Sequence, residues 1–120
     1  MELTKSKSIL RRLKRAFVKR VTQADMINVH ISQCKYPVIL CGDFNDTPAS
    51  YVYHTIRGYL KDAFIESGTG FEQTYVGKFP RFRIDYIFHS PSFQSKQYHH
   101  VTETLTDHYP IVCYLQANFE

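Results

Sequence analysis

At 120 residues, the chain has the usual length of one domain and is long enough to bury a core. Aromatic residues make up 15% of the sequence, which excludes an intrinsically disordered segment. The formal net charge of +4 is uneven, because residues 1–20 hold eight Lys or Arg and one Glu, a net +7, which leaves −3 for the other hundred residues. The basic character therefore belongs to the first segment.

The first segment has the periodicity of a helix. Apolar residues recur three and four positions apart between Ser8 and Ser32, which predicts an amphipathic helix with Ser8 as its N-cap. They are Leu10, Leu13, Phe17, Val21, Ala24, Ile27 and Ile31. Basic residues occupy the other face over residues 8–20. This face has two interpretations: a solvated helix surface, or a platform for nucleic acid or an anionic membrane.

A short apolar run leads into a group of polar residues. Val38–Cys41 is too short and too apolar for an amphipathic helix and predicts a strand buried on both faces. Alternation along the extended chain places Asp43 and Asn45 on one side and Phe44 on the other. The carboxylate and the amide can converge there on a water, a metal or a phosphate.

The remaining pattern mixes short helices and strands, so we expect an α/β (α+β) fold. Ser50 is predicted to cap a short helix that ends near Gly58. The predicted strands are Gln73–Val76, Phe82–Phe88, residues 97–104 and Ile111–Leu115. A basic helix over residues 1–32 and a sheet region over residues 36–116 then form a single domain.

Three cysteines, Cys34, Cys41 and Cys113, lack the spacing of metal ligands. Two of them lie in apolar runs, so we expect buried thiols in a reducing compartment, with the cytoplasm as the expected location. No apolar run approaches the roughly 20 residues that a membrane span needs.

Polar groups lie beside three predicted strands and are expected to build one site. Asp85 interrupts an apolar strand and needs a hydrogen-bonding partner, and His108 needs a group that fixes its tautomer, so we expect the two to pair. Arg83 is an alternative partner for Asp85. Asp43 and Asp107 remain to bind a hard cation or to activate water.

Other candidates are weaker. His99 and His100 are neighbours in a predicted strand and point to opposite faces, which is poor for metal binding, so we expect surface residues. Tyr75, Tyr86 and Tyr109 are interpreted as packing residues.

Three ordered motifs resemble the endonuclease/exonuclease/phosphatase superfamily. They are Gly42-Asp43-Phe44-Asn45, then Arg83-Ile84-Asp85-Tyr86-Ile87-Phe88, then Asp107-His108-Tyr109-Pro110. The resemblance spans residues 20–116 and implies half of a four-layered α/β/β/α sandwich of the DNase I-like type, with mostly antiparallel sheets and helices outside. Where the family usually has Ser before its Asp-His pair, this chain has Thr106, which keeps the hydroxyl.

The resemblance also implies a role for each matching residue. Asp43 polarises the attacking water or contacts the metal, Mg²⁺ or Mn²⁺, and Asn45 binds the phosphate. Asp85 orients the catalytic histidine, His108, and Asp107 lies close to the metal. The substrate class is a phosphoester, in a nucleic acid, a sugar phosphate or a lipid head group.

The family's first half, which carries a metal-binding Glu, has no counterpart before residue 20. We therefore expect weak or no hydrolysis by this chain alone, and self-association or strand exchange through its uncovered edges. The alternative is a non-catalytic remnant or binding module that uses the basic helix on nucleic acid or an anionic membrane.

Overall fold

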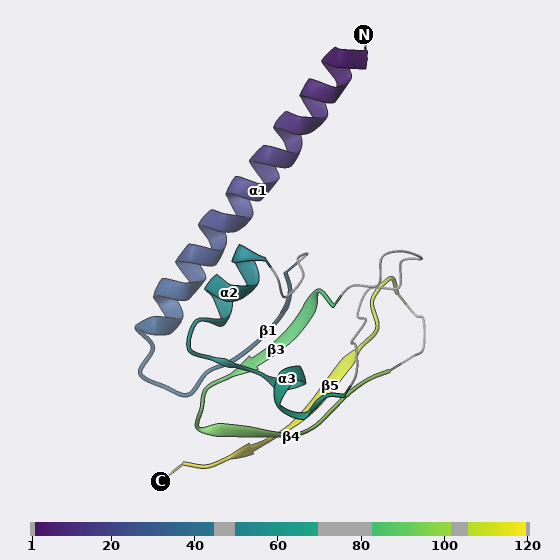
Figure 1. The fold of residues 1–120 in the computed structure, drawn as a ribbon. Helices are drawn as coiled ribbons and strands as arrows, with labels where there is room; N and C mark the ends of the chain where they lie inside the picture. The colour runs from purple at the N-terminus through teal and green to yellow at the C-terminus, as the bar shows by residue number, and fades with distance from the viewer. Residues whose placement is uncertain (1, 45–49, 70–82, 102–105, 120) are drawn as a thin grey trace.

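The computed structural model describes residues 2–44, 50–69, 83–101 and 106–119. They form two antiparallel sheets with helices beside them (Figure 1), which confirms the expected mixed α/β class. The helices are α1 (Glu2–Ser32), α2 (Tyr51–Arg57) and α3 (Ala63–Ser67). The strands are β1 (Ile39–Asp43), β2 (Lys61–Asp62), β3 (Asp85–His89), β4 (Phe93–His100) and β5 (Ile111–Ala117). The strand expected at Gln73–Val76 lies outside the described residues.

Helix α1 packs on the rest of the molecule only through its C-terminal half. It begins at Glu2, so the expected N-cap at Ser8 is wrong. Ala24 and Ile31 are buried against α2, whereas every residue from 4 to 19 is exposed and this part of the helix extends away from the body (Figure 1). Despite its length, α1 does not qualify as a membrane span, and neither does any other helix in the described residues.

The first sheet has the strand order β1-β3-β2, with both pairings antiparallel. Helices α1 and α2 cover the face that carries Leu40 and Phe44, where the buried rings of Tyr53, Tyr86 and Phe88 form the core. The burial of Tyr86 confirms its expected packing role.

The expectation that the first strand is buried on both faces is wrong. Exposed and partly buried residues alternate along β1, and Ile39 is 51% exposed. The helices pack on only one face of this strand, so its other side chains lie open within the described part of the chain.

Short helix α2 begins as the sequence predicts. The Ser50 hydroxyl accepts a hydrogen bond from the backbone N–H of Tyr53 at 3.0 Å, and the helix ends at Gly58. Gly58 has a φ of +50°, in the left-handed region that glycine tolerates best.

The second sheet consists of β4 and β5, connected to the first sheet through α3. Strand β4 begins at Phe93, earlier than predicted, and has an irregularity between Ser95 and Gln97. The carboxylate of Glu66 in α3 accepts a hydrogen bond from the backbone N–H of Ser95. This contact ties the end of α3 to the start of β4.

Arg83 forms a buried ion pair with Asp62, so the alternative pairing of Arg83 with Asp85 is wrong. The two guanidinium nitrogens lie 2.8 and 3.0 Å from the two carboxylate oxygens, and both side chains are buried. The Tyr53 hydroxyl also donates to this carboxylate at 2.7 Å. Burial, with a further contribution from Asp62, raises the pKa of Tyr53 to about 12.

The expectation of buried thiols is also wrong. Cys34 and Cys41 are exposed, and Cys113 is half-buried. Cys41 lies on the open face of β1, where the described residues provide no covering layer. The apolar sequence around it identified the strand correctly but not which face is covered.

We expect Asp62→Ala to lower the free energy of unfolding by about 3–5 kcal/mol, because it leaves the Arg83 guanidinium buried without its counter-charge. Urea denaturation followed by circular dichroism measures the change. Asp25→Ala is the matched control, since Asp25 also accepts from a tyrosine hydroxyl, that of Tyr51, but at an exposed position. Equal losses for the two variants would contradict the structural role of the buried pair.

Candidate active site

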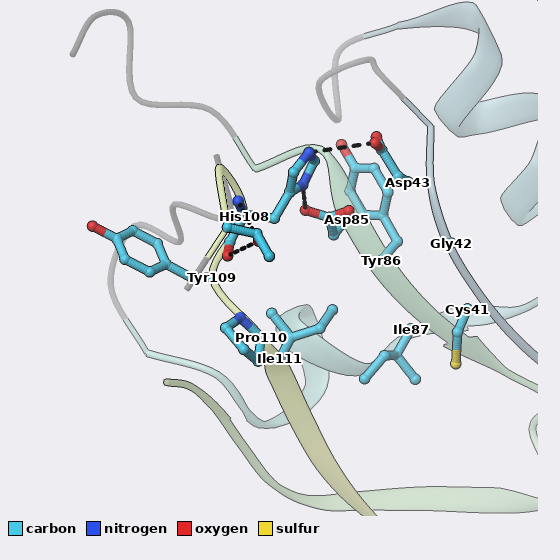
Figure 2. A pocket seen from close by; sticks show the side chains of 11 residues that line it. Cys41, Gly42, Asp43, Asp85, Tyr86, Ile87, His108, Tyr109, Pro110 and Ile111 are labelled. Atoms are coloured by element: carbon cyan, nitrogen blue, oxygen red, sulfur yellow. Dashed lines mark hydrogen bonds and ion pairs between the residues drawn. The ribbon is translucent and has the colours of Figure 1, made fainter. Parts of the chain in front are cut away.

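The site forms where β1 ends and β3 begins. The antiparallel register places Asp43 directly opposite Asp85, and the segment that leads into β5 brings His108 against both (Figure 2). Phe44 turns to the other side of the sheet and packs on Tyr86, with ring centroids 4.8 Å apart. The predicted separation of Asp43 from Phe44 is therefore confirmed. Asn45, predicted to share the side of Asp43, lies outside the described residues.

Asp85 forms a hydrogen bond with one nitrogen of the His108 ring, as expected. Nδ1 of His108 lies 2.6 Å from Oδ2 of Asp85, so the protonated nitrogen donates to the carboxylate. The hydroxyl of Thr106 accepts from the backbone N–H of His108 at 3.1 Å, which fixes the turn that carries the ring. One hydrogen bond at the ring and one at the backbone of His108 thereby fix the orientation of the imidazole.

The other ring nitrogen faces two carboxylates. Nε2 of His108 lies 3.6 Å from Oδ2 of Asp43 and 3.9 Å from Oδ1 of Asp107. The pKa of His108 is raised above its ordinary 6.5, chiefly by the hydrogen bond to Asp85, while partial burial opposes the shift and the charges of the three carboxylates add to it. The surrounding carboxylates therefore stabilise the imidazolium form relative to the neutral ring.

The donor set suits a hard cation. Ligand atoms of Asp43, Asp85 and His108 lie within 4.8 Å of one another. Asp85 already accepts the proton of His108, so the carboxylates of Asp43 and Asp107, which are 38% and 74% exposed, are the groups that could bind Mg²⁺ or Mn²⁺. Two carboxylates are fewer ligands than such an ion takes, so water or substrate oxygens would complete its shell.

An apolar pocket of about 380 Å³ adjoins these polar groups. Its polar rim is Asp43, Asp85 and His108, and its apolar lining includes Cys41, Ile87, Tyr109 and Ile111 (Figure 2). The sequence analysis did not assign the apolar lining to the site. Strand alternation could have found part of it, because Cys41 and Ile87 lie two residues from Asp43 and Asp85 on the same faces.

Other histidines remain outside this cluster. The ring of His99 lies 6.4 Å from that of Tyr114, and the ring of His100 lies 5.6 Å from that of Tyr109. Neither belongs to the group of possible metal ligands found among the described residues. His99 is exposed, as expected, and His100 is half-buried.

We expect NMR titration to give His108 a pKa above 6.5, and Asp85→Asn to lower it by removing the hydrogen bond that raises it most. Because the folded-state pKa is raised, the stabilisation by His108 is fully present below pH 6.5 and is lost as the pH rises through the raised value. The difference in unfolding free energy between the wild type and His108→Gln should shrink over the same range. Asp25→Asn is the control; an unchanged titration in Asp85→Asn would contradict this assignment.

Comparison with known proteins identifies related chains. The family model described as Endonuclease/Exonuclease/phosphatase family matches residues 17–108. A mannosyl-6-phosphatase from Bacteroides thetaiotaomicron VPI-5482 is 27% identical with a TM-score of 0.69, and the match covers 81% of this chain and 45% of that one. A comparison with curated proteins finds no match.

Two further structures share the fold. An endonuclease/exonuclease/phosphatase from Bacteroides vulgatus is 30% identical, with a TM-score of 0.69 and coverage of 82% of this chain and 44% of its own. A protein from Enterococcus faecalis V583, described as functionally unknown, is 21% identical with a TM-score of 0.70, over 82% and 44% of the two chains. The chain thus spans less than half the length of the structures that it matches.

The geometry around His108 and the comparisons agree with the resemblance of the three motifs. The described residues form part of the DNase I-like sandwich found in the matched structures. The family model matches more than half of this chain, and the chain therefore belongs to the endonuclease/exonuclease/phosphatase family.

Proposed function

We propose that this chain supplies part of the active site of a metal-dependent phosphoester hydrolase. The observation that carries the proposal is the position of His108, with Asp85 on one ring nitrogen and Asp43 and Asp107 beside the other. A protonated His108 can donate a hydrogen bond to a phosphoryl oxygen, which gains negative charge in the transition state. The neighbouring carboxylates stabilise the protonated ring. The family supports phosphoester chemistry in general.

In this proposal His108 acts as an imidazolium. Its Nε2–H donates to a phosphoryl oxygen, while Asp85 keeps the other nitrogen protonated and the ring in place. Asp43 accepts a proton from the attacking water or orients that water. Asn45 binds another phosphate oxygen, a role that the family motif suggests. As the bond from the water oxygen to phosphorus forms and the bond to the leaving oxygen breaks, the proton of the water passes to Asp43 and the leaving oxygen takes a proton from solvent.

Asp43 and Asp107 are the residues proposed to hold Mg²⁺ or Mn²⁺. A bound divalent cation neutralises charge on phosphoryl oxygens and lowers the pKa of a coordinated water. The oxygen ligands of both aspartates favour a hard cation over a soft one such as Cu(I).

A phosphomonoester is the substrate to test first. The matched mannosyl-6-phosphatase is a phosphatase by description, and its identity to this chain is 27%. The small pocket of about 380 Å³ also suits a phosphate on a compact leaving group. Nucleic acid and lipid phosphodiesters are the competing classes, and bis(p-nitrophenyl) phosphate tests for diesterase activity.

We expect slow Mg²⁺-dependent hydrolysis of p-nitrophenyl phosphate by the isolated chain, lost on addition of EDTA. Asp43→Asn and His108→Ala should each lower the rate about 100-fold or more, because the first removes the acceptor of the water proton and the second removes the cationic hydrogen-bond donor to the phosphoryl oxygen. Asp25→Asn is the control, since Asp25 is an exposed carboxylate that accepts from Tyr51 and is not among the residues around His108. Absorbance of released p-nitrophenol measures the rate.

Binding of inorganic phosphate provides a second readout if turnover is at background. We expect phosphate with Mg²⁺ to shift the His108 ring signals in NMR spectra, and Asp43→Asn to weaken that shift. Rates and shifts that are unchanged in both variants would contradict the proposed roles. Robust turnover by the isolated chain, abolished by the same substitutions, would instead contradict the expectation that it holds only part of the site.

A second candidate function rests on the basic half of α1. Arg11, Lys14, Arg15 and Lys19 are spaced three and four residues apart on one side of this helix, with Val18 among them, and all are exposed. We propose nucleic acid as the anionic partner, since clustered cations attract a line of phosphates.

For this second candidate we expect duplex DNA binding that weakens with salt. The double variant Lys14→Gln/Arg15→Gln should reduce the slope of log affinity against log salt by roughly 0.9 for each phosphate that the helix no longer neutralises. Lys35→Gln/Lys96→Gln removes the same charge from exposed positions elsewhere and is the control. Fluorescence anisotropy measures binding. Equal slopes in both variants, or binding only to phosphatidylserine vesicles, would exclude this function.

A further inference from the structure

One face of β3 is turned toward the second sheet. Asp85, Ile87 and His89 lie two residues apart along this strand and therefore share that face. Asp85 contacts His108 at one end of it. In the middle, Ile87 lines the pocket together with Ile111 of β5 (Figure 2). His89 lies at the other end of the face, away from the candidate site.

The carboxylate of Glu66 contacts three strands from two sheets. Its Oε1 accepts a hydrogen bond from the backbone N–H of Ser95 in β4. Its Oε2 lies 3.5 Å from Nε2 of His89 in β3 and 4.0 Å from Nζ of Lys61 in β2. The side chain of Glu66 is only 20% exposed, and His89 and Ser95 are buried. Glu66 therefore joins the first sheet to the second.

Neighbouring groups fix both partners of this carboxylate. Nδ1 of His89 lies 2.9 Å from the backbone oxygen of Ser90 and donates to it, so Nε2 is the ring nitrogen that faces Glu66. The Ser95 hydroxyl donates to the backbone oxygen of Ala63 in α3 at 3.3 Å. Helix α3 thus contacts the start of β4 through both a side chain and the main chain.

The ladder between β4 and β5 connects Glu66 with the candidate site. Strand β4 pairs with β5 as far as its last residue, His100, which is opposite Ile111. His108 lies three residues before Ile111. Two strands that are hydrogen-bonded over this length are expected to shift together. A displacement of Ser95 should therefore change the position of His108 relative to Asp85.

We propose that Glu66 is a positioning residue for His108. By joining β3 to β4 at one end of β3, its carboxylate sets the separation between Nδ1 of His108 and Asp85 at the other end. The length of the Glu66 side chain is the decisive property, because the carboxylate has to reach both Ser95 and His89. The inference rests on the proposed function only for its effect on the hydrolysis rate.

Two conservative variants separate the length of this side chain from its charge. Glu66→Gln keeps the length, retains an oxygen that accepts from Ser95, and has an amide that can donate to Nε2 of His89. Glu66→Asp keeps the charge but is one methylene shorter, so it cannot reach both strands. We expect Glu66→Gln to behave like the wild type and Glu66→Asp to displace His108.

The tautomer of His108 measures that displacement without any turnover. Ring ¹⁵N chemical shifts, recorded at a pH where the ring is neutral, report which nitrogen carries the proton, and the hydrogen bond to Asp85 favours Nδ1–H. We expect the ratio of the Nδ1–H to the Nε2–H form to fall at least about threefold in Glu66→Asp and to change less than about 1.5-fold in Glu66→Gln.

Hydrolysis of p-nitrophenyl phosphate gives a second measurement. We expect Glu66→Asp to lower kcat about tenfold and to change KM less than about twofold, because a displaced imidazole affects the transition state more than substrate binding. Glu66→Gln should keep both constants close to those of the wild type.

Two controls account for lost stability and for the exposed contact. Ile56→Val loosens the buried core on the helix-covered face of the first sheet without touching Glu66. Lys61→Gln removes the longest contact of Glu66, to a side chain that is 53% exposed. Both should leave the tautomer ratio of His108 unchanged. Circular dichroism verifies that every variant is folded.

Three results would overturn the proposal. The first is an unchanged tautomer ratio in folded Glu66→Asp. The second is an equal fall in Glu66→Asp and Ile56→Val, which would make the role of Glu66 one of stability alone. The third is a fall in Glu66→Gln but not in Glu66→Asp, which would assign the effect to charge. If the ratio shifts as expected while the wild type shows no hydrolysis or phosphate binding, the positioning role is supported and the proposed function is contradicted.

Discussion

The register between β1 and β3 is the constraint on which the site depends. It sets Asp43 opposite Asp85, so that one histidine from a distant segment can reach both carboxylates. A slip by one residue would turn Asp43 to the face that α1 and α2 cover and place Phe44 on the open face. The aromatic packing of Phe44 on Tyr86 and Phe88 opposes that slip. Packing on one face thus fixes the positions of the two carboxylates on the other.

A buried ion pair supports the same strand from its start. Arg83 lies two residues before β3 and is fixed by the carboxylate of Asp62, while the rings of Phe64 and Tyr86 lie 4.7 Å from its guanidinium carbon. These contacts define where the chain enters the sheet, two residues before Asp85. Charged groups therefore serve two separate purposes here. Asp62 is buried and structural, whereas Asp43 and Asp107 are accessible to solvent and to a substrate.

The open face of β1 carries both parts of the pocket. Cys41 lines the pocket beneath the polar groups and is exposed, as is Ile39. Asp43 lies two residues from Cys41 on the same face. The polar rim and part of the apolar lining therefore come from alternate residues of one strand.

The sequence by itself determined the family and much of the secondary structure. Each motif is local, so the place of Asp43 at the end of an apolar strand and the pairing of Asp85 with His108 could be predicted from residue types and alternation. The strand predicted over Phe82–Phe88 instead begins at Asp85 among the described residues. Ser50 was identified as a helix cap for the same reason.

Only the tertiary structure decided which faces are covered and which charges pair. Arg83 is two residues from Asp85 yet pairs with Asp62, because its side chain enters the core beside α3. Cys41 and Ile39 have apolar neighbours in sequence and are nonetheless exposed. Burial depends on which distant elements pack on a strand, and that information is not contained in the local sequence of the strand.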